Sequence, residues 1–265
     1  MNKFYIQIAL FILSIFAYAN NVTLATELAP EENATPKSNH YFPTPEEVYE
    51  KNKHLLCTDP EEIKNAEELM NEAVKHLEYH ATSKEGYKLF LETPDGGISH
   101  YKKKHEGNTK VLKVNLNIYA SNQYDEIINK FWDPDTPNTF NTGSVKIVRV
   151  YNPNLVIIEQ RCPQKCTLHH KYFYALAKRT QISENKTIIV MTSADIDDHN
   201  PFRRKYKNKI IKSADLFKTS IDSEYYIRQE GSKNLYVNIA GYLVEKKGDN
   251  LEVTYVESID GKRRT

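Results

Sequence analysis

The chain has 265 residues and a net charge of +1, with 40% hydrophobic and 27% charged residues, which are values typical of a globular protein. They exclude a disordered chain, a collagen-like fibre and a polytopic membrane protein, and the balanced charge gives no global attraction to nucleic acid. The chain contains 18 tyrosines but only 9 glycines. This skew favours β-rich structure with an interior lined by tyrosine and argues against a glycine-rich nucleotide-binding loop.

The N-terminus has the pattern of a secretory signal peptide. Lys3 precedes an apolar run over residues 4–16, which is followed by Ala17 and Ala19 in a small-x-small cleavage pattern. The run is shorter than the ~20 residues that a membrane-spanning helix requires. We therefore expect residues 1–19 to be cleaved and the protein to be secreted.

The segment 20–43 is expected to be a disordered polar tether, because it is rich in proline and too poor in apolar groups to offset the entropy lost on ordering. Cleavage of the signal peptide removes one lysine and leaves equal numbers of basic and acidic residues in the rest of the chain. Residues 44–265 are expected to form one folded domain.

Two helices are predicted at the start of this domain. Thr44-Pro45-Glu46-Glu47 is a capping pattern, from which a helix should run to about Leu56, and Asp59-Pro60-Glu61-Glu62 repeats the pattern before a longer helix. The longer helix carries an apolar stripe with three- and four-residue spacing, so we expect it to lie on an apolar surface. The stripe consists of Ala66, Leu69, Met70, Ala73, Val74 and Leu77.

From Tyr87 onwards the hydrophobic period changes to two, which is typical of strands. Asp95-Gly96-Gly97 predicts a hairpin turn between the first two strands, and one short helix is predicted over 123–131. The other predicted strands are 111–119, 145–151, 155–161, 172–177, 187–192, 209–217, 235–244 and 251–256. Short links between consecutive strands predict an antiparallel sheet in an α+β protein, and a sheet curved around a helix can enclose a ligand cavity.

Three cysteines in a secreted chain leave one unpaired after a single disulfide. Cys162 and Cys166 are close in sequence, and we predict a disulfide between them, which leaves Cys57 over. A metal site is not expected here, because these two cysteines with the adjacent His169 and His170 make a poor tetrahedral ligand set.

No catalytic motif is present, so we expect a non-enzymatic protein without a cofactor. The cluster Asp195, Asp197 and Asp198 beside His199 is open to interpretation as a general base or a metal site. A solvated turn after the strand 187–192 is the favoured alternative.

Basic residues gather at Lys102-Lys103-Lys104 and within 200–212, where no acidic residue occurs. A solvated loop is the default interpretation of each cluster. The functional alternative is docking on an anionic membrane, worth ~1 kcal/mol per basic residue near the surface. Nucleic acid fits less well, because no aromatic platform is interleaved with these charges. The expected docking residues are Arg203, Arg204, Lys205 and Lys207.

Five segments together carry a family resemblance over about residues 44–261. They are 60–81, Phe131-Trp132-Asp133, 170–175, 187–194 and 253–260. In combination they resemble the fam-a family of malaria parasites (Plasmodium), whose members are secreted START-related proteins. The resemblance implies a helix-grip fold, in which a curved antiparallel sheet grips a helix around an apolar tunnel, and it implies binding and transfer of phospholipid, specifically phosphatidylcholine. It also implies action outside the parasite cell, in the parasitophorous vacuole or the host erythrocyte.

The resemblance also implies a ligand site. Asp133 occupies the position of a family aspartate that pairs with an arginine deep in the tunnel, but the position of that arginine is occupied here by Asn129. Tyr172 occupies the position of a family tyrosine that helps to enclose the choline group. A second aromatic residue of that enclosure is replaced in this chain by Ile158. The ligand-binding residues expected from the resemblance are Trp132, Asp133, Tyr172, Tyr174 and Phe217. The long C-terminal helix that covers the tunnel in START domains is expected to be missing, because the chain stops soon after Asp260.

Two functional hypotheses follow. The first is a secreted, non-enzymatic carrier that holds one phospholipid in an internal cavity and exchanges it at membranes, with no nucleic-acid partner. The second is an exposed antigenic or protein-interaction module, directed at a host-cell target, that keeps the START-like fold without lipid transport. The missing lid helix and the incomplete choline enclosure favour the second hypothesis.

Overall fold

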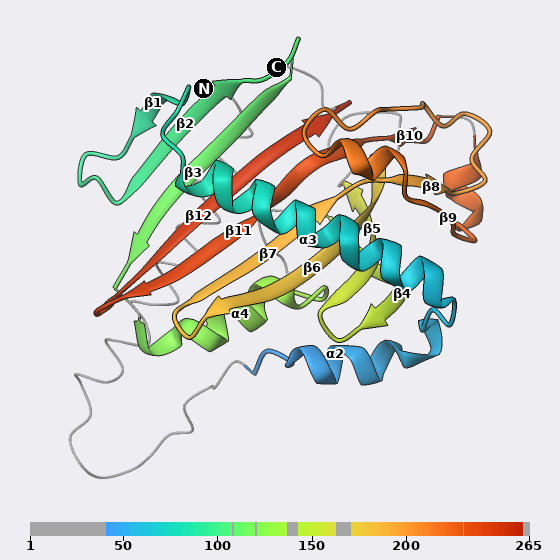
Figure 1. Ribbon diagram of the computed structural model, residues 1–265, viewed down its shortest axis with the longest axis horizontal. Coiled ribbons are helices and arrows are strands. Elements are labelled where there is room, and N and C mark those ends of the chain that lie inside the picture. Colours follow the sequence, from blue (N-terminus) through green and yellow to red (C-terminus); the bar gives the residue numbers. More distant parts are fainter. Residues whose placement is uncertain are drawn as a thin grey trace.

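A ten-stranded sheet with helices on both faces forms the framework of the computed structural model, which describes residues 41–107, 109–119, 121–136, 143–162, 171–229 and 231–261 (Figure 1). In spatial order the main path of the sheet is β1 (Lys88–Glu92), β2 (Ile98–Lys104), β3 (Lys110–Ile118), β12 (Asn250–Asp260), β11 (Tyr236–Lys247), β7 (Lys186–Thr192), β6 (Lys171–Ser183), β5 (Leu155–Cys162) and β4 (Val145–Asn152). All neighbours on this path are antiparallel. The predicted α+β class and antiparallel sheet are confirmed.

Three short strands lie off this path. β10 (Lys233–Asn234) pairs in parallel with β6, and β8 (Asp195–Asp197) pairs in parallel with β9 (Lys218–Ser220) in a separate two-stranded sheet. The helices are α2 (Pro45–Asn52), α3 (Pro60–Thr82) and α4 (Tyr124–Trp132), with short 3-10 turns η1 (Lys53–Leu55), η2 (Ser121–Gln123), η3 (Lys212–Asp215) and η4 (Tyr225–Arg228). Up to Gly261, the last described residue, no helix follows β12.

Both predicted helix starts are confirmed. The Thr44 side chain accepts a hydrogen bond from the Glu47 backbone N–H while the Glu47 side chain accepts one from the Thr44 backbone N–H, which is a complete capping box. Asp59 caps α3 by accepting from the first free backbone N–H groups. The first helix ends at Asn52 rather than Leu56, because the chain tightens into η1.

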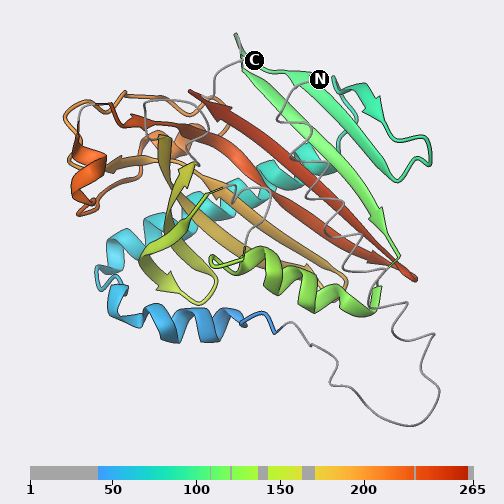
Figure 2. The same cartoon turned by 180° about the vertical axis from the view of Figure 1, so that it is seen from behind.

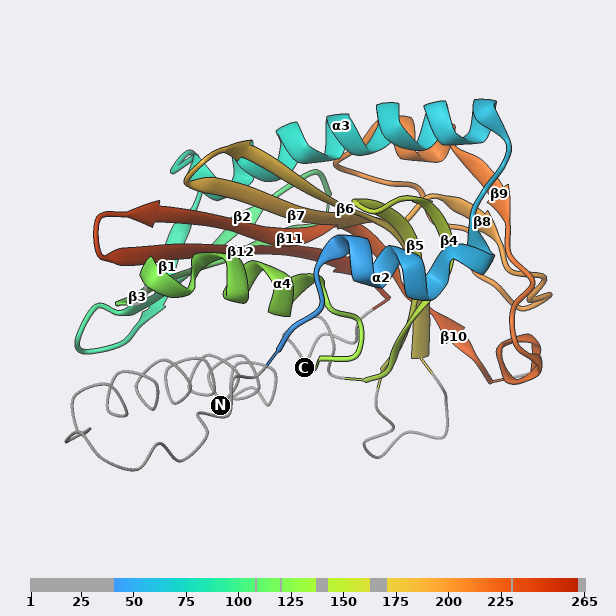
Figure 3. The ribbon, with the colours of Figure 1, turned by 90° about the horizontal axis from the view of Figure 1, so that it is seen from below.

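The sheet separates two apolar cores. Figure 3 shows α3 along one face of the sheet and α4 and α2 against the other, and Figure 2 shows α4 in front of the strands. The alternation of side chains along a strand assigns residues to these faces. In β6, Tyr172, Tyr174 and Leu176 belong to the α3-side core, whereas Phe173 and Ala175 belong to the α4-side core.

The segment 209–217, which was predicted to be a strand, is not part of the sheet. The Asn208 side chain turns the chain here, because its Oδ1 accepts hydrogen bonds from the backbone N–H groups of Ile210 and Ile211 at 3.0 and 2.8 Å. Its Nδ2 donates to the Asn238 carbonyl of β11 at 3.0 Å. Ile210, Ile211, Ala214 and Phe217 are therefore buried in the α3-side core around η3, whereas Leu216 is exposed.

Some predictions fall outside the described residues. They concern the signal peptide 1–19, the tether up to residue 40, and the cysteine and histidines at positions 166, 169 and 170. In the part of the chain that the structure describes, no helix combines the length and apolar character needed to cross a membrane.

Gly241 of β11 lies where α3 crosses the sheet. A Cβ atom at this position would overlap the Ile189 carbonyl oxygen and would lie 2.9 Å from Val190 Cα and 3.0 Å from Leu77 Cδ2. Only glycine permits such a close approach of backbone and helix.

We predict that Gly241→Ala lowers the free energy of unfolding by about 1–3 kcal/mol, because the added methyl group overpacks the contact with α3. Urea denaturation measures the change. Gly97→Ala is the control, since a Cβ there would come no closer than 3.4 Å to its nearest neighbour, Asp95. Equal stability of the two variants would contradict this account.

His80, in the last turn of α3, is buried, with only 3% of its surface exposed. Its Nδ1 lies 2.9 Å from the Tyr87 hydroxyl. Burial, together with nearby cationic groups, lowers the pKa of His80 from 6.5 to about 4. The nearby groups are Lys103, His105, His76 and Lys113.

This pKa shift predicts a loss of stability on acidification. Between pH 6.5 and about 4 the unfolded chain binds a proton at His80 that the folded chain does not bind, so the free energy of unfolding falls as the pH falls through this window. His80→Asn, which does not titrate, should lose less stability over the same window in urea denaturation at pH 7, 5.5 and 4.5. Parallel pH profiles for the two proteins would refute the assignment.

Candidate functional site

A small apolar cavity of about 50 Å³ lies between the end of α4 and the sheet. Strands β4 to β7 form its floor, and α4 with the turn that follows forms its roof. The lining residues are Phe131, Trp132, Asp133, Pro134, Val145, Ile147, Val156, Ile158, Ala177, Ile189 and Met191. This is the place in the fold where the predicted tunnel should lie, and here it is nearly filled by side chains.

Trp132 introduces an unsatisfied polar group into this apolar site. The residue is 8% exposed, and its indole Nε1–H has no hydrogen-bond partner among the described residues. A buried donor without a partner costs about 1–3 kcal/mol, so such groups are rare and call for an explanation. An acceptor oxygen on a bound ligand would satisfy this donor.

Asp133 lines the same cavity but uses its carboxylate locally. Oδ1 accepts a hydrogen bond from the Asp135 backbone N–H at 3.0 Å, and Oδ2 accepts one from the Thr136 hydroxyl at 2.6 Å. The backbone N–H of Asp133 donates to the Asn129 carbonyl at 2.9 Å and ends the helix. Asp133 therefore fixes the turn after α4.

The structure does not bring the other three predicted ligand residues to this cavity. Tyr172, Tyr174 and Phe217 lie in the α3-side core, on the opposite face of the sheet from Trp132. The reason is the two-residue period of β6, which directs both tyrosines away from α4. The five residues expected to form one site are therefore divided between two.

Tyr172 belongs to a buried polar network. Its hydroxyl donates to Asp198 Oδ2 at 2.6 Å and accepts from Asn200 Nδ2 at 2.8 Å. Burial, reinforced by the hydrogen bond to Asp198, raises the pKa of Tyr172, so its hydroxyl stays protonated and acts as a donor. The interpretation of this segment as a solvated turn is wrong at Asp198, which is 1% exposed.

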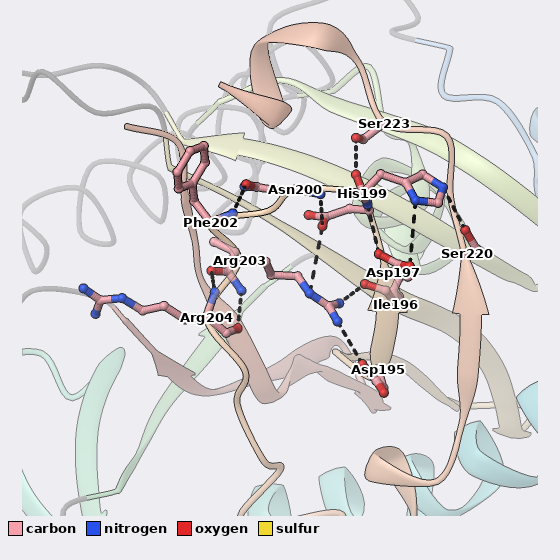
Figure 4. A network of polar contacts seen from close by, with 12 residues as sticks. Asp195, Ile196, Asp197, His199, Asn200, Phe202, Arg203, Arg204, Ser220 and Ser223 are labelled. Carbon is pink, nitrogen blue, oxygen red and sulfur yellow. Dashed lines mark hydrogen bonds and ion pairs between the residues drawn. The ribbon is translucent and has the colours of Figure 1, made fainter. Parts of the chain in front are cut away.

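The neighbouring loop contains a backbone in an unusual conformation. His199 has a φ of 55°, and it is the one non-glycine residue with positive φ in the described ranges. Its backbone N–H donates to Asp197 Oδ1 at 3.0 Å, and its ring Nε2 lies 3.1 Å from the Ser220 hydroxyl (Figure 4). These contacts tie the loop to β8 and to β9 across the two-stranded sheet.

The predicted docking residues differ in their surroundings. Arg203 turns inward, where it pairs with Asp195 at 3.0 Å and donates to the Ile196 carbonyl, so it is not free to meet a membrane. The side chains of Arg204, Lys205 and Lys207 are exposed, and Figure 4 shows that of Arg204 directed away from the network. The prediction of a four-residue docking surface is therefore wrong for Arg203.

Sequence reasoning missed a second polar centre, at Glu159 of β5. This carboxylate is 2% exposed and accepts hydrogen bonds from the Tyr174 hydroxyl at 2.8 Å, the Tyr226 hydroxyl at 2.5 Å and Arg161 Nε at 2.8 Å. It fixes η4 to the sheet. The signal in the sequence was a single acidic residue at the end of the apolar run Leu155–Ile158.

Neither a disulfide nor a metal site can be assigned from the described residues. Cys162 is described but Cys166 is not, so the predicted disulfide stays a prediction. Cys57 carries a free thiol, and burial raises its pKa. Within the described ranges no three His, Cys, Asp or Glu side chains form a group able to hold a metal ion.

The fold resembles solved lipid-transfer domains. Human StAR-related lipid transfer protein 5 matches with a TM-score of 0.52 and 13% identity, over 76% of this chain and 85% of that chain. Human STARD10 matches with a TM-score of 0.48 and 12% identity over 74% and 69% of the two chains, and human StarD13 with 0.44 and 15% over 74% and 85%. No family model and no curated protein matches this chain. The domain is START-like, and the predicted helix-grip class of fold is confirmed.

We predict that Tyr172→Phe lowers the free energy of unfolding by about 1–3 kcal/mol, because it leaves the buried Asp198 carboxylate without its hydroxyl donor. Urea denaturation at pH 7 measures the change. Tyr225→Phe makes the same chemical change at a residue that is 79% exposed and should alter stability by less than about 0.5 kcal/mol. If the two variants behave alike, the network does not stabilise the fold.

Proposed function

We propose that this protein binds a lipid between α4 and the sheet and transfers it between membranes without catalysing a reaction. The observation that carries the proposal is the unsatisfied Trp132 indole N–H in an otherwise apolar cavity. An ester carbonyl or phosphate oxygen of a phospholipid is an acceptor of the required kind, and its acyl chains match the apolar walls. The similarity in fold to a human protein named for lipid transfer supports the same conclusion.

Lipid entry requires movement of α4. The cavity of about 50 Å³ is far smaller than the roughly 300–1,000 Å³ of typical ligand pockets. α4 has 9 residues, and a helix this short depends on tertiary contacts for its position. Among the contacts that hold it, the Phe131 ring stacks on Tyr242 with centroids 4.1 Å apart, and the Tyr124 hydroxyl lies 2.9 Å from Thr187 Oγ1. Loss of these contacts would enlarge the cavity.

Exchange at a membrane would use the exposed cations of the loop after β8. The exposed side chains of Arg204, Lys205 and Lys207 can approach an anionic membrane surface. Each basic residue near such a surface contributes ~1 kcal/mol of favourable binding free energy. The predicted signal peptide supports action outside the cell that makes the protein. The resemblance to the fam-a family supports phosphatidylcholine as the first lipid to test and a parasite vacuole or host erythrocyte as the destination.

A second candidate function is a protein-interaction or antigenic module that retains the fold without transporting lipid. The filled cavity favours it, because a core closed by its own side chains has no space for a ligand in this conformation. This candidate predicts that the purified protein carries no lipid.

The test is to narrow the cavity. Ala177→Leu adds bulk to the cavity wall, so it should reduce both the lipid that co-purifies, measured by mass spectrometry, and the transfer of fluorescent phosphatidylcholine between vesicles by at least about tenfold, which is 1.4 kcal/mol. Ala81→Leu is the matched control, because Ala81 is equally buried at 6% exposure but lies in the α3-side core.

Equal effects of the two variants would mean that general destabilisation, not occupation of the cavity, reduces lipid binding. Absence of both co-purified lipid and transfer in the unmodified protein would overturn the carrier proposal and support the interaction module.

A further inference from the structure

The connection between β7 and β11 is much longer than the sheet requires. These strands are antiparallel neighbours, which a turn of a few residues can join, but here the chain runs through residues 193–235 before it returns. In its described part the connection contains only short elements, namely β8, η3, β9, η4 and β10, and long connections of this kind often carry binding sites. This connection, residues 193–235, is called the crossover below.

The crossover is fixed in place by polar anchors. The Ser193 hydroxyl donates to the Tyr174 carbonyl at 2.7 Å and accepts from the Val237 backbone N–H at 3.0 Å. The Asn234 side chain bonds both backbone groups of Arg204, each at 2.9 Å. A loop held at several points along its length presents a preorganised surface, which lowers the entropic cost of binding a ligand.

The crossover and the end of β6 enclose an open cavity of about 710 Å³. This volume falls within the roughly 300–1,000 Å³ of typical ligand pockets. Tyr172 and Tyr174 lie at its base, on the face of β6 opposite α4. The cavity is therefore separate from the proposed lipid site, and its role does not rest on lipid binding.

The carboxylates of this cavity already have partners within the chain. Asp195 pairs with Arg203 at 3.0 Å, and Asp198 accepts the Tyr172 hydroxyl. Asp215 Oδ1 accepts the Asn208 backbone N–H at 2.8 Å. The fourth, Asp197, accepts the backbone N–H of His199 at 3.0 Å. Each nevertheless retains acceptor capacity, because a carboxylate has about four lone-pair sites.

Apart from Arg203, which pairs with Asp195, the cations of the cavity differ from the carboxylates in having no such partners. Arg204, Lys205, Lys207 and Lys218 all line it, all are exposed, and none forms an ion pair within the described part of the chain. Three lie on the loop after β8 and one on β9. Because Arg203 is compensated by Asp195, the lining keeps four exposed cations against three carboxylates, so its net charge is positive and favours an anionic ligand.

One wall of the cavity also holds an unsatisfied hydroxyl. Tyr236 is 7% exposed and its ring stacks on Tyr206 with centroids 5.6 Å apart. Its hydroxyl lies close enough to Asp215 and Asn208 to interact with both, but it is not aligned for a hydrogen bond with either. A polar group on a ligand that enters the cavity could complete the hydrogen bonding of this hydroxyl.

We infer that this cavity binds a phosphorylated polyol, with its phosphate groups on the unpaired cations and its hydroxyl groups on Tyr236 and the remaining carboxylate oxygens. A phosphate supplies nearly two negative charges and three acceptor oxygens at pH 7. Hydroxyl groups match a lining that contains carboxylates as well as cations. A fatty acid, with one charge and an apolar body, matches neither feature.

The experiment is isothermal titration calorimetry of the purified chain with D-myo-inositol 1,4,5-trisphosphate as the probe. We expect binding that is at least about tenfold tighter than that of inorganic phosphate or of unphosphorylated inositol. Inorganic phosphate lacks the hydroxyl groups of the polyol, and inositol lacks the phosphate groups. Vesicles of phosphatidylcholine with and without phosphatidylinositol 4,5-bisphosphate distinguish a lipid headgroup from a free polyol phosphate as the source. Binding to either source supports the inference.

Paired variants distinguish binding in this cavity from non-specific electrostatic attraction to the protein surface. Arg204→Ala/Lys218→Ala should weaken binding of the trisphosphate at least about tenfold, and Tyr236→Phe should weaken it about three- to tenfold without any change of charge. Lys102→Ala/Lys104→Ala is the control, since it removes the same charge from exposed positions of β2 that do not line the cavity.

The inference is overturned if the trisphosphate does not bind at millimolar concentration. It is also overturned if the control weakens binding as much as Arg204→Ala/Lys218→Ala does, or if inorganic phosphate binds equally well. Circular dichroism of each variant establishes that it is folded before it is compared. Ala177→Leu, on the other side of the sheet, should leave the affinity for the trisphosphate unchanged.

Discussion

Burial of the central strands on both faces is the constraint on which the rest of the structure depends. α3 covers β6, β7 and β11 from one side, while α4 and its neighbours cover the other, so successive residues such as Ile188 and Ile189 enter different cores. The buried stretches of these strands have no solvent-facing positions to carry binding groups. Polar chemistry is therefore displaced to the strand ends and to the crossover, where Tyr172, Ser193 and Asn238 meet the loop.

The same two-sided burial explains how far sequence reasoning could go. Helix starts depend on local chemistry, and the caps at Thr44 and Asp59 were predictable for that reason. The segment 209–217 was not, because its β-branched and aromatic residues have strand propensity but are turned into η3 by Asn208, whose partners lie elsewhere in the sequence. Propensity gives no information about such tertiary contacts.

Only part of the candidate site could be predicted from the sequence, because the sequence does not show which face of the sheet each side chain occupies. Trp132 and Asp133 are adjacent in sequence and remain adjacent at the cavity under α4. Tyr172 and Tyr174 were grouped with them through a family resemblance, which does not specify the face of β6 from which each side chain projects. The polar cavity could not have been found from sequence, because it is assembled from residues on β6, the crossover and the start of β11, and only the fold brings these together.

An open sheet also has two free edges, and both are poorly suited to pairing with another chain. β1 is only 5 residues long, its register with β2 shifts between Leu89 and Leu91, and it is bounded by Lys88 and Glu92. At the other edge, Leu56 bridges Val150 of β4 and shields part of its backbone. Short, irregular or covered edges resist strand-to-strand aggregation. The fold can thus leave its sheet unclosed without becoming a template for polymerisation.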